Sequence, residues 1–173
     1  ISLKSVGGLN FKTASAALKN VIGKEAMRFQ FLLESERLSK AEKDSYQRLI
    51  KIGTTSESIY DMTDATLIDS LQTLSQLLEK HYGQKVILLI DEYDVPLDKA
   101  FQDGYYDEMV NLIRNLFANV LKTNDSLYFA VLTGCLRISK ESIFTGFNNL
   151  KVHTISDVRY DEYFGFTNTD VDE

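Results

Sequence analysis

Two short runs of apolar residues stand out along the chain, and each one ends in polar side chains. The first, Val86–Ile90, is followed directly by Asp91 and Glu92, and the second is Leu127–Leu132. Short, unbroken apolar runs that include β-branched residues are typical of strands buried on both faces, as in a parallel sheet. The pattern therefore predicts two buried strands of a parallel sheet.

The segments around these runs place their apolar residues three and four positions apart, which is the spacing of one face of a helix. We expect helices over Phe11–Leu33, Ser39–Ile52, Thr63–Tyr82 and Tyr105–Lys122, a helical turn at Ser139–Ile143, and further strands over Ile1–Val6 and Leu150–Ile155. Strands that alternate with helices predict an α/β fold with a parallel sheet.

Local signals predict where these elements begin and end. Ser39 and Glu42 have the spacing of a capping box at the start of a helix. Gly83 is the expected stop of the helix before the first strand, and Asp98–Gly104 is expected to be a polar connection. The helical stripes on either side are predicted to be core: Leu67, Leu71, Leu74, Leu78, Met109, Ile113, Leu116 and Val120.

Two adjacent carboxylates at the end of a buried strand point to chemistry, because burying unpaired charge is strongly unfavourable. Ligands of open α/β sheets bind at the carboxyl ends of the strands. In a Walker B strand the first carboxylate, here Asp91, holds Mg²⁺, usually through water. The second, here Glu92, polarises the water that attacks the γ-phosphate. A solvated turn or a helix cap explains the same two residues equally well.

A second polar group, which includes Thr133, Gly134, Arg137 and Ser139–Lys140, follows the second strand. In a parallel sheet it lies at the same end as Asp91. A hydroxyl there can orient water or contact a γ-phosphate, and an arginine can neutralise charge on the transferred phosphate. A backbone hydrogen bond from Thr133 and a salt bridge from Arg137 to an acidic neighbour are equally good explanations.

Composition narrows the class of protein. The chain has 173 residues, 44% of them hydrophobic, which suffices for one domain with a sizeable core. Cys135 is the single cysteine, so an intrachain disulfide is excluded, and we expect it to be a small buried residue rather than a nucleophile. With two histidines a zinc site is not expected. The single cysteine fits a reducing compartment. No apolar run approaches the roughly 20 residues of a membrane span and no signal peptide is visible, so a cytoplasmic protein is expected.

The net charge of −6 is unevenly distributed, because residues 1–52 carry ten Lys or Arg and five Asp or Glu. A basic segment of this kind can contact nucleic acid or an acidic partner. Its charges are spread over a helical pattern, however, which favours a solvated face.

Three runs, in order, resemble the AAA-ATPase-like family of bacterial and archaeal proteins. They are VILLIDEYDVPL, AVLTGCLRISKESIFTGFNNL and SDVRYDEYFGFT. In that family these runs supply the Walker B strand, the polar sensor region at a strand end, and the start of a C-terminal lid. The resemblance implies a P-loop three-layer sandwich that uses ATP and Mg²⁺, can form oligomers, and is often followed by a nuclease-like domain.

Residue by residue, the resemblance assigns Asp91 to the metal and Glu92 to the catalytic water. It assigns Thr133 to a sensor position at the nucleotide, and Arg137 to a phosphate or interdomain contact. It gives no chemical role to Asp94, which belongs to the same motif. Any partner protein or nucleic acid is expected to act through domains outside this sequence.

The sequence departs from the family at the phosphate-binding loop. P-loop ATPases need G-x-x-x-x-G-K-[ST], and the nearest glycine pair, Gly7-Gly8, lacks the lysine and the hydroxyl residue. In the family this loop precedes the segment that resembles Ile1–Val6. Residues 1–173 are therefore expected to be a partial domain, truncated at both ends and missing the P-loop strand. The parent protein is expected to be an ATPase and the isolated fragment to be inactive.

Two functions of different classes remain open. The first is the hydrolytic part of an ATPase domain, and the second is a non-catalytic interaction module that keeps the fold, with Asp91 and Glu92 as structural relics. A nuclease would need a Glu-x-Lys pattern on a strand that follows Asp91, and no such strand is present. The family's strand order predicts that Leu127–Leu132 pairs in parallel with Val86–Ile90, brings Thr133 near Asp91 and Glu92, and has an open edge on its other side.

Overall fold

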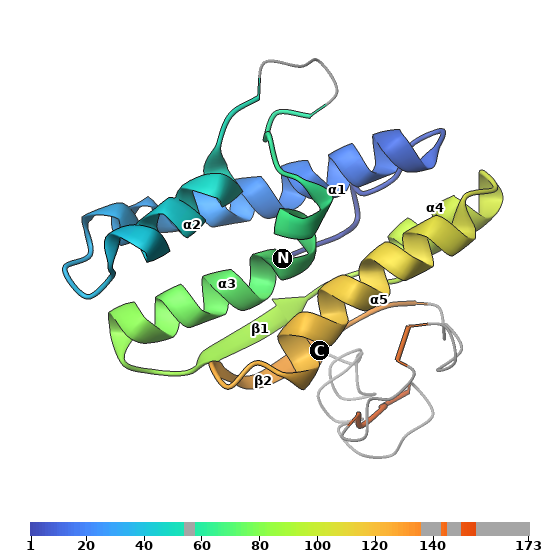
Figure 1. Cartoon of the computed structure of the whole chain (residues 1–173). Helices are drawn as coiled ribbons and strands as arrows, with labels where there is room; N and C mark the ends of the chain where they lie inside the picture. Colours follow the sequence, from blue (N-terminus) through green and yellow to red (C-terminus); the bar gives the residue numbers. More distant parts are fainter. Residues whose placement is uncertain (54–57, 136–142, 145–149, 155–173) are drawn as a thin grey trace, which may run out of the picture.

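The computed structural model describes residues 1–53, 58–135, 143–144 and 150–154. Helices and strands are mixed along the chain, in agreement with an α/β class (Figure 1). In chain order the elements are α1 (Phe11–Ala26), the 3₁₀ helix η1 (Met27–Glu34), α2 (Lys40–Ile50), α3 (Asp64–Tyr82), β1 (Val86–Ile90), α4 (Val95–Gln102), α5 (Tyr106–Lys122) and β2 (Leu127–Leu132).

The two central strands pair with each other as predicted. β1 and β2 are parallel, with Ile87 opposite Phe129 and Ile90 opposite Leu132. Among the described residues, β2 pairs with β1 alone. Asp91 and Glu92 after β1 and Thr133 after β2 therefore lie at one end of the sheet.

The outer strands expected from the sequence are reduced or absent. Ile1–Val6 forms a single parallel bridge, between Ser2 and Asp91, at the free edge of β1. The backbone N–H of Leu3 donates to the Asp91 carbonyl at 2.9 Å, and the Asp91 N–H donates to the Ile1 carbonyl at 2.8 Å. The described part of the last predicted strand, residues 150–154, contains no strand. Residue 155 and most of the predicted turn, residues 139–142, lie outside the described residues.

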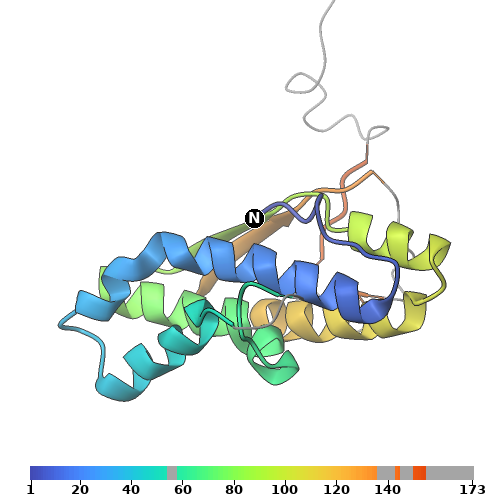
Figure 2. The same cartoon turned by 90° about the horizontal axis from the view of Figure 1, so that it is seen from above.

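The helices cover one face of the sheet. Figure 2 shows α1, α3 and α5 on the same side of the two strands. Leu88 and Ile90 are buried, whereas the alternating residues Ile87 and Leu89 are 50% and 57% exposed. The prediction of strands buried on both faces is thus wrong for the described structure, because no described helix covers the second face. The described residues thus form one layer of helices and the sheet, whereas a three-layer sandwich was expected.

The helices α3 and α5 form the centre of the core. The stripes predicted from their spacing are buried at Leu67, Leu71, Leu74, Met109, Ile113, Leu116 and Val120, and Leu78 is half-buried. Each such apolar side chain contributes roughly 1.5–3 kcal/mol when it is removed from water. Within the described part of the chain, no helix is both long and apolar enough to cross a membrane.

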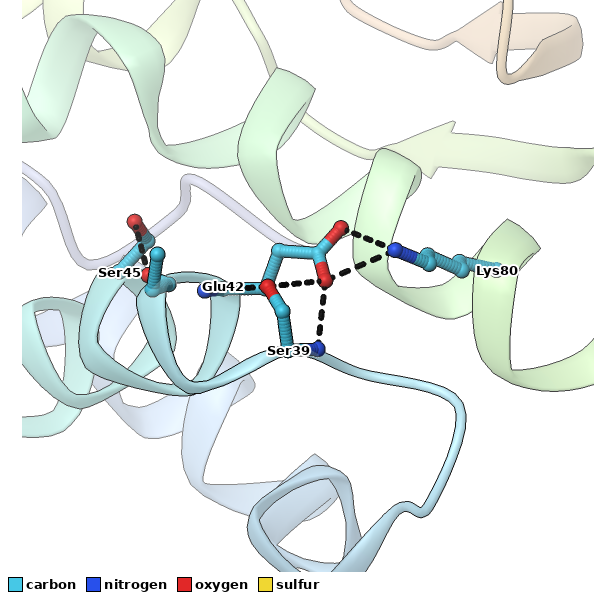
Figure 3. Close-up of polar contacts among 5 residues, drawn as sticks. Ser39, Glu42, Ser45 and Lys80 are labelled. Carbon is cyan, nitrogen blue, oxygen red and sulfur yellow. Dashed lines mark hydrogen bonds and ion pairs between the residues drawn. The ribbon is translucent and has the colours of Figure 1, made fainter.

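The predicted helix ends follow their local signals. At the start of α2 the backbone N–H of Ser39 donates to the Glu42 carboxylate at 2.7 Å, and the Ser39 side chain accepts from the Glu42 N–H (Figure 3). Thr63 caps α3 by accepting from the Thr66 N–H at 3.1 Å. α3 then ends at Gly83, whose φ of 72° is left-handed and favours glycine.

Two predicted boundaries are wrong. The expected helix Phe11–Leu33 changes to a 3₁₀ helix after Ala26, with a kink at Phe29. Most of the expected connection Asp98–Gly104 is helical, because α4 extends to Gln102. The N–H groups in the first turn of a helix have no partner within the helix, so a proline there costs no hydrogen bond. Pro96 in the first turn is therefore compatible with the start of α4. The buried Leu97 and Ala100 then hold the helix in the core.

Candidate active site at the carboxyl ends of β1 and β2

Main-chain hydrogen bonds join the two strand ends directly. The Thr133 N–H donates to the Ile90 carbonyl at 2.9 Å, and the Tyr93 N–H donates to the Thr133 carbonyl at 3.1 Å. Both main-chain groups of Thr133 are therefore bound: its N–H to Ile90, which precedes Asp91, and its carbonyl to Tyr93, which follows Glu92. The prediction that these residues meet at one end of the sheet is confirmed.

Asp91 and Thr133 are also joined by their side chains. The Thr133 hydroxyl Oγ1 donates to the Asp91 carboxylate oxygen Oδ1 at a short 2.5 Å. Both residues are exposed at the sheet end, so a solvent molecule or a ligand can reach them. The backbone of Asp91 is fixed at the same time by its two hydrogen bonds to the Ile1–Leu3 segment. The carboxylate is thus held in one orientation and remains accessible.

Glu92 has an unusual backbone conformation. It is the one non-glycine residue with a positive φ, 54°, among those that the structure describes. The left-handed region costs a residue such as glutamate about 1–2 kcal/mol, and such strain is concentrated at functional sites. The conformation turns the chain sharply at the end of β1, so that the Tyr93 N–H reaches the Thr133 carbonyl just beyond β2.

The two residues after Glu92 enter the core. Asp94 is only 2% exposed although it carries a carboxylate. Burial, and next the charge of Asp94, raise the pKa of the Tyr93 phenol. The Tyr93 ring packs edge-on against Phe144, with 5.4 Å between the ring centroids. No role for Asp94 was predicted from the sequence, although a third acidic residue directly before α4 and two positions before Pro96 was a visible signal.

The remaining predicted residues of the second polar group divide into two sets. Arg137 and Ser139–Lys140 lie outside the described residues, so their predicted roles stay predictions. Cys135 is exposed, and the expectation that it is buried is wrong. It follows Gly134 beyond the last hydrogen-bonded residue of β2, where the chain leaves the sheet.

The chemistry of Asp91 fits a magnesium ion bound together with a nucleotide. Mg²⁺ in nucleotide sites is held by one or two carboxylates, several waters and the phosphates, rather than by a cage of protein ligands. In the described ranges no three or more His, Cys, Asp and Glu side chains gather into a metal cluster. An accessible carboxylate with one oxygen oriented by Thr133 suits the first kind of site.

Comparisons with known proteins give a family and one relative. A family model described as "Predicted AAA-ATPase" matches residues 1–144. An "Uncharacterized protein in vnfD 5'region" of Azotobacter chroococcum mcd 1 is 38% identical over 91 residues, which are 52% of this chain and 17% of that protein. The match therefore spans about a sixth of the length of this relative. No solved structure matches.

Proposed function

The chain belongs to the predicted AAA-ATPase family, and from this premise we propose that it forms the hydrolytic part of a domain that binds Mg-ATP and cleaves its γ-phosphate. The hydrogen bond between Thr133 and Asp91 is the observation that carries the proposal. It supports an accessible, oriented carboxylate at the sheet end where open α/β folds bind ligands. In this proposal β1 with Asp91 and Glu92 is the Walker B strand, and Thr133 is the sensor residue.

Asp91 is proposed to hold the metal through water. An ion held there would supply positive charge to neutralise the charge that develops on the phosphates. Thr133 donates to Oδ1 of Asp91, so Oδ2 is the carboxylate oxygen that would hold the ion. Because the carboxylate is already oriented, little reorganisation accompanies the reaction, which is how sites of this class lower the barrier.

Glu92 is proposed to accept a hydrogen bond from the attacking water and to polarise it. Its strained backbone supports this role, because residues are held in the left-handed region mainly where the surrounding structure and the function require it. Arg137 is proposed to contact phosphate. The G-x-x-x-x-G-K-[ST] loop is not in this sequence, so binding of the β- and γ-phosphates is assigned to a segment outside residues 1–173.

A substitution of Glu92 tests the proposal in a protein that includes both this chain and a phosphate-binding loop. Glu92→Gln removes the negative charge that polarises water and keeps the size of the side chain. We expect ATP turnover to fall on the order of 10²-fold or more, while the Kd for Mg-ATP stays within about threefold of the parent value. Steady-state phosphate release and equilibrium titration measure the two quantities.

The matched control is Glu36→Gln, because Glu36 is exposed in the connection between η1 and α2. This variant should keep both turnover and affinity. Parental turnover in Glu92→Gln contradicts the assignment of Glu92, and a parent protein without any ATP turnover contradicts the proposed function itself.

A non-catalytic interaction module is the second candidate. The observation in its favour is the apolar sheet face that the described helices leave exposed, which includes Ile87, Leu89, Phe129 and Val131. Contiguous apolar surface of this kind is typical of interaction sites. The two candidates differ in turnover, because a module with this fold alone binds a partner without hydrolysing ATP.

A further inference from the structure

The proposed function gives Asp94 no part in binding the metal or activating water, yet this residue is almost fully buried at the site. We propose that Asp94 is a positioning residue: its carboxylate packs against Gly134 and holds the end of β2 so that Thr133 stays beside Asp91. The consequence for catalysis rests on the proposed ATPase function, whereas the positioning itself does not.

The contact with Gly134 carries the proposal. A Cβ atom placed on Gly134 would lie 2.7 Å from Oδ1 and 2.9 Å from Cγ of Asp94, and 2.9 Å from Cε1 of Tyr93. Ordinary contacts of a Cβ atom begin near 3.4 Å. Gly134 does not have a positive φ, so backbone conformation does not require glycine here. Glycine is required because β2 ends in direct contact with the Asp94 side chain.

The backbone of Asp94 is anchored independently of this contact. Its carbonyl accepts hydrogen bonds from the N–H groups of Leu97 and Asp98, both at 3.0 Å, and so begins α4. α4 packs on α5 through buried residues of the core. The Asp94 side chain therefore projects from a fixed element, and Gly134 is placed against a rigid surface.

The energetic balance also favours a specific role at this position. Burying a carboxylate costs several kcal/mol unless hydrogen bonds or dipoles compensate, and an apolar residue would avoid that cost. Asp94 precedes the first residue of α4, where the positive end of the helix dipole stabilises a negative charge. A carboxylate is therefore compatible with the start of α4, and its planar group supplies the surface that Gly134 contacts.

The contact between Asp94 and Gly134 affects the site through Thr133. Gly134 directly follows Thr133, whose amide and carbonyl bind Ile90 and Tyr93 and whose hydroxyl binds Asp91. A shift of Gly134 therefore displaces Thr133 and releases the Asp91 carboxylate from its orientation. No group that contacts the phosphates or the water is removed by such a shift.

Two substitutions test the positioning, each measured in the protein that contains this chain. Gly134→Ala introduces the clash, and Asp94→Ala removes the surface on which Gly134 rests. We expect amide hydrogen exchange at Thr133 and Tyr93 to become about tenfold faster or more in both variants, because their hydrogen bonds open locally. Exchange at Leu88, within β1, should keep its parental rate.

The double variant Asp94→Ala, Gly134→Ala provides a sharper measurement. Removing the carboxylate makes room for the added methyl group, so the two effects should be strongly non-additive. Asp94→Asn, which keeps the shape of the side chain, should restore most of the protection at Thr133. The controls are Gly53→Ala, where the added Cβ meets no atom closer than 3.4 Å, and Asp103→Ala, an exposed residue at the other end of α4.

Turnover supplies the second readout. Asp94→Ala and Gly134→Ala should each lower kcat on the order of 10- to 100-fold through misplacement, with the Kd for Mg-ATP within about threefold of the parent value. Parental exchange at Thr133 and Tyr93 in both variants overturns the positioning role, whatever the turnover. Faster exchange with parental kcat overturns its catalytic consequence. Lack of turnover in the parent protein contradicts the proposed function, and the exchange rates then decide the positioning role of Asp94 by themselves.

Discussion

Glu42 shows how far one residue can combine local and distant interactions. Its carboxylate accepts hydrogen bonds from the N–H and the hydroxyl of Ser39, both at 2.7 Å, and from the Lys80 ammonium at 2.7 and 2.9 Å (Figure 3). The Lys80 ammonium and then the Ser39 groups lower the pKa of Glu42 from 4.5 to about 2. The capping box was visible in the sequence, but the link from α2 to the end of α3 was not.

Because the pKa of Glu42 is lower in the folded chain, its contribution to stability is present above pH 4.5 and is lost as the pH falls toward 2. The side chain of Lys80 is half exposed, so solvent screening limits the contribution to about 1 kcal/mol. We therefore expect Glu42→Gln to lower the free energy of unfolding by about 1 kcal/mol at pH 7 and by progressively less between pH 4.5 and pH 3. Urea denaturation at several pH values measures this difference.

Glu36→Gln again serves as the control, and it should be neutral throughout this pH range. A constant difference between Glu42→Gln and the parent from pH 7 to pH 3 would contradict the ionic origin of the effect. A cycle with Lys80→Met isolates the share that comes from the ion pair.

At the scale of elements, the junction of α1 and α2 depends on a buried hydroxyl. Tyr46 of α2 is fully buried, and its hydroxyl donates to the Ala26 carbonyl, at the end of α1, at 2.6 Å. The last carbonyls of a helix have no partner within the helix, so this bond satisfies one of them where α1 changes to η1. A tyrosine within a polar helix was no signal of this contact, because its partner is 20 residues away.

Tyr46→Phe should lower the free energy of unfolding by about 1–2 kcal/mol, because the Ala26 carbonyl loses its buried partner while the ring still packs. Burial raises the pKa of Tyr46 from 10 to about 12. The parent therefore keeps this stability below pH 10 and loses it as the pH rises toward 12, and the Phe variant should lack that dependence. Denaturant titrations at pH 7 and pH 11 test both points, with Tyr82→Phe, which is 60% exposed, as the control.

For the whole molecule, the arrangement of layers decides what the chain can do alone. Helices cover one face of the two-stranded sheet, and among the described residues β2 pairs with β1 alone. Asp91, Glu92 and Thr133 lie at one end of this sheet, whereas the sequence holds no loop of the kind that cradles phosphates. Without that loop, the β- and γ-phosphates of a nucleotide lack their main binding groups, even though the carboxylates are positioned.

We therefore expect isothermal titration of the 173 residues with Mg-ATP to show no binding tighter than about millimolar, because catalysis and binding in this class depend on positioning of the phosphates. Titration with Mg²⁺ alone is the control for binding to the carboxylates. Micromolar affinity for Mg-ATP would show that residues within this chain hold the phosphates, and it would contradict the assignment of that task to another segment.

Local patterns were sufficient to predict much of this protein. Apolar spacing predicted α3, α5, β1 and β2, and local end signals predicted the start of α2 at Ser39 and the end of α3 at Gly83, because such features depend on neighbours within a few residues. The parallel pairing that brings Thr133 to Asp91 followed from the resemblance to a family with a known order of strands.

Only the tertiary structure decided the contacts between residues far apart in the chain. The packing of Gly134 on Asp94 and the turn at Glu92 leave no periodic trace in the sequence. The same holds for the coverage of the sheet on one face, because an apolar strand has the same composition whether one of its faces is covered or both. Close approach and burial are properties of pairs of segments, and the order of residues along one segment does not contain them.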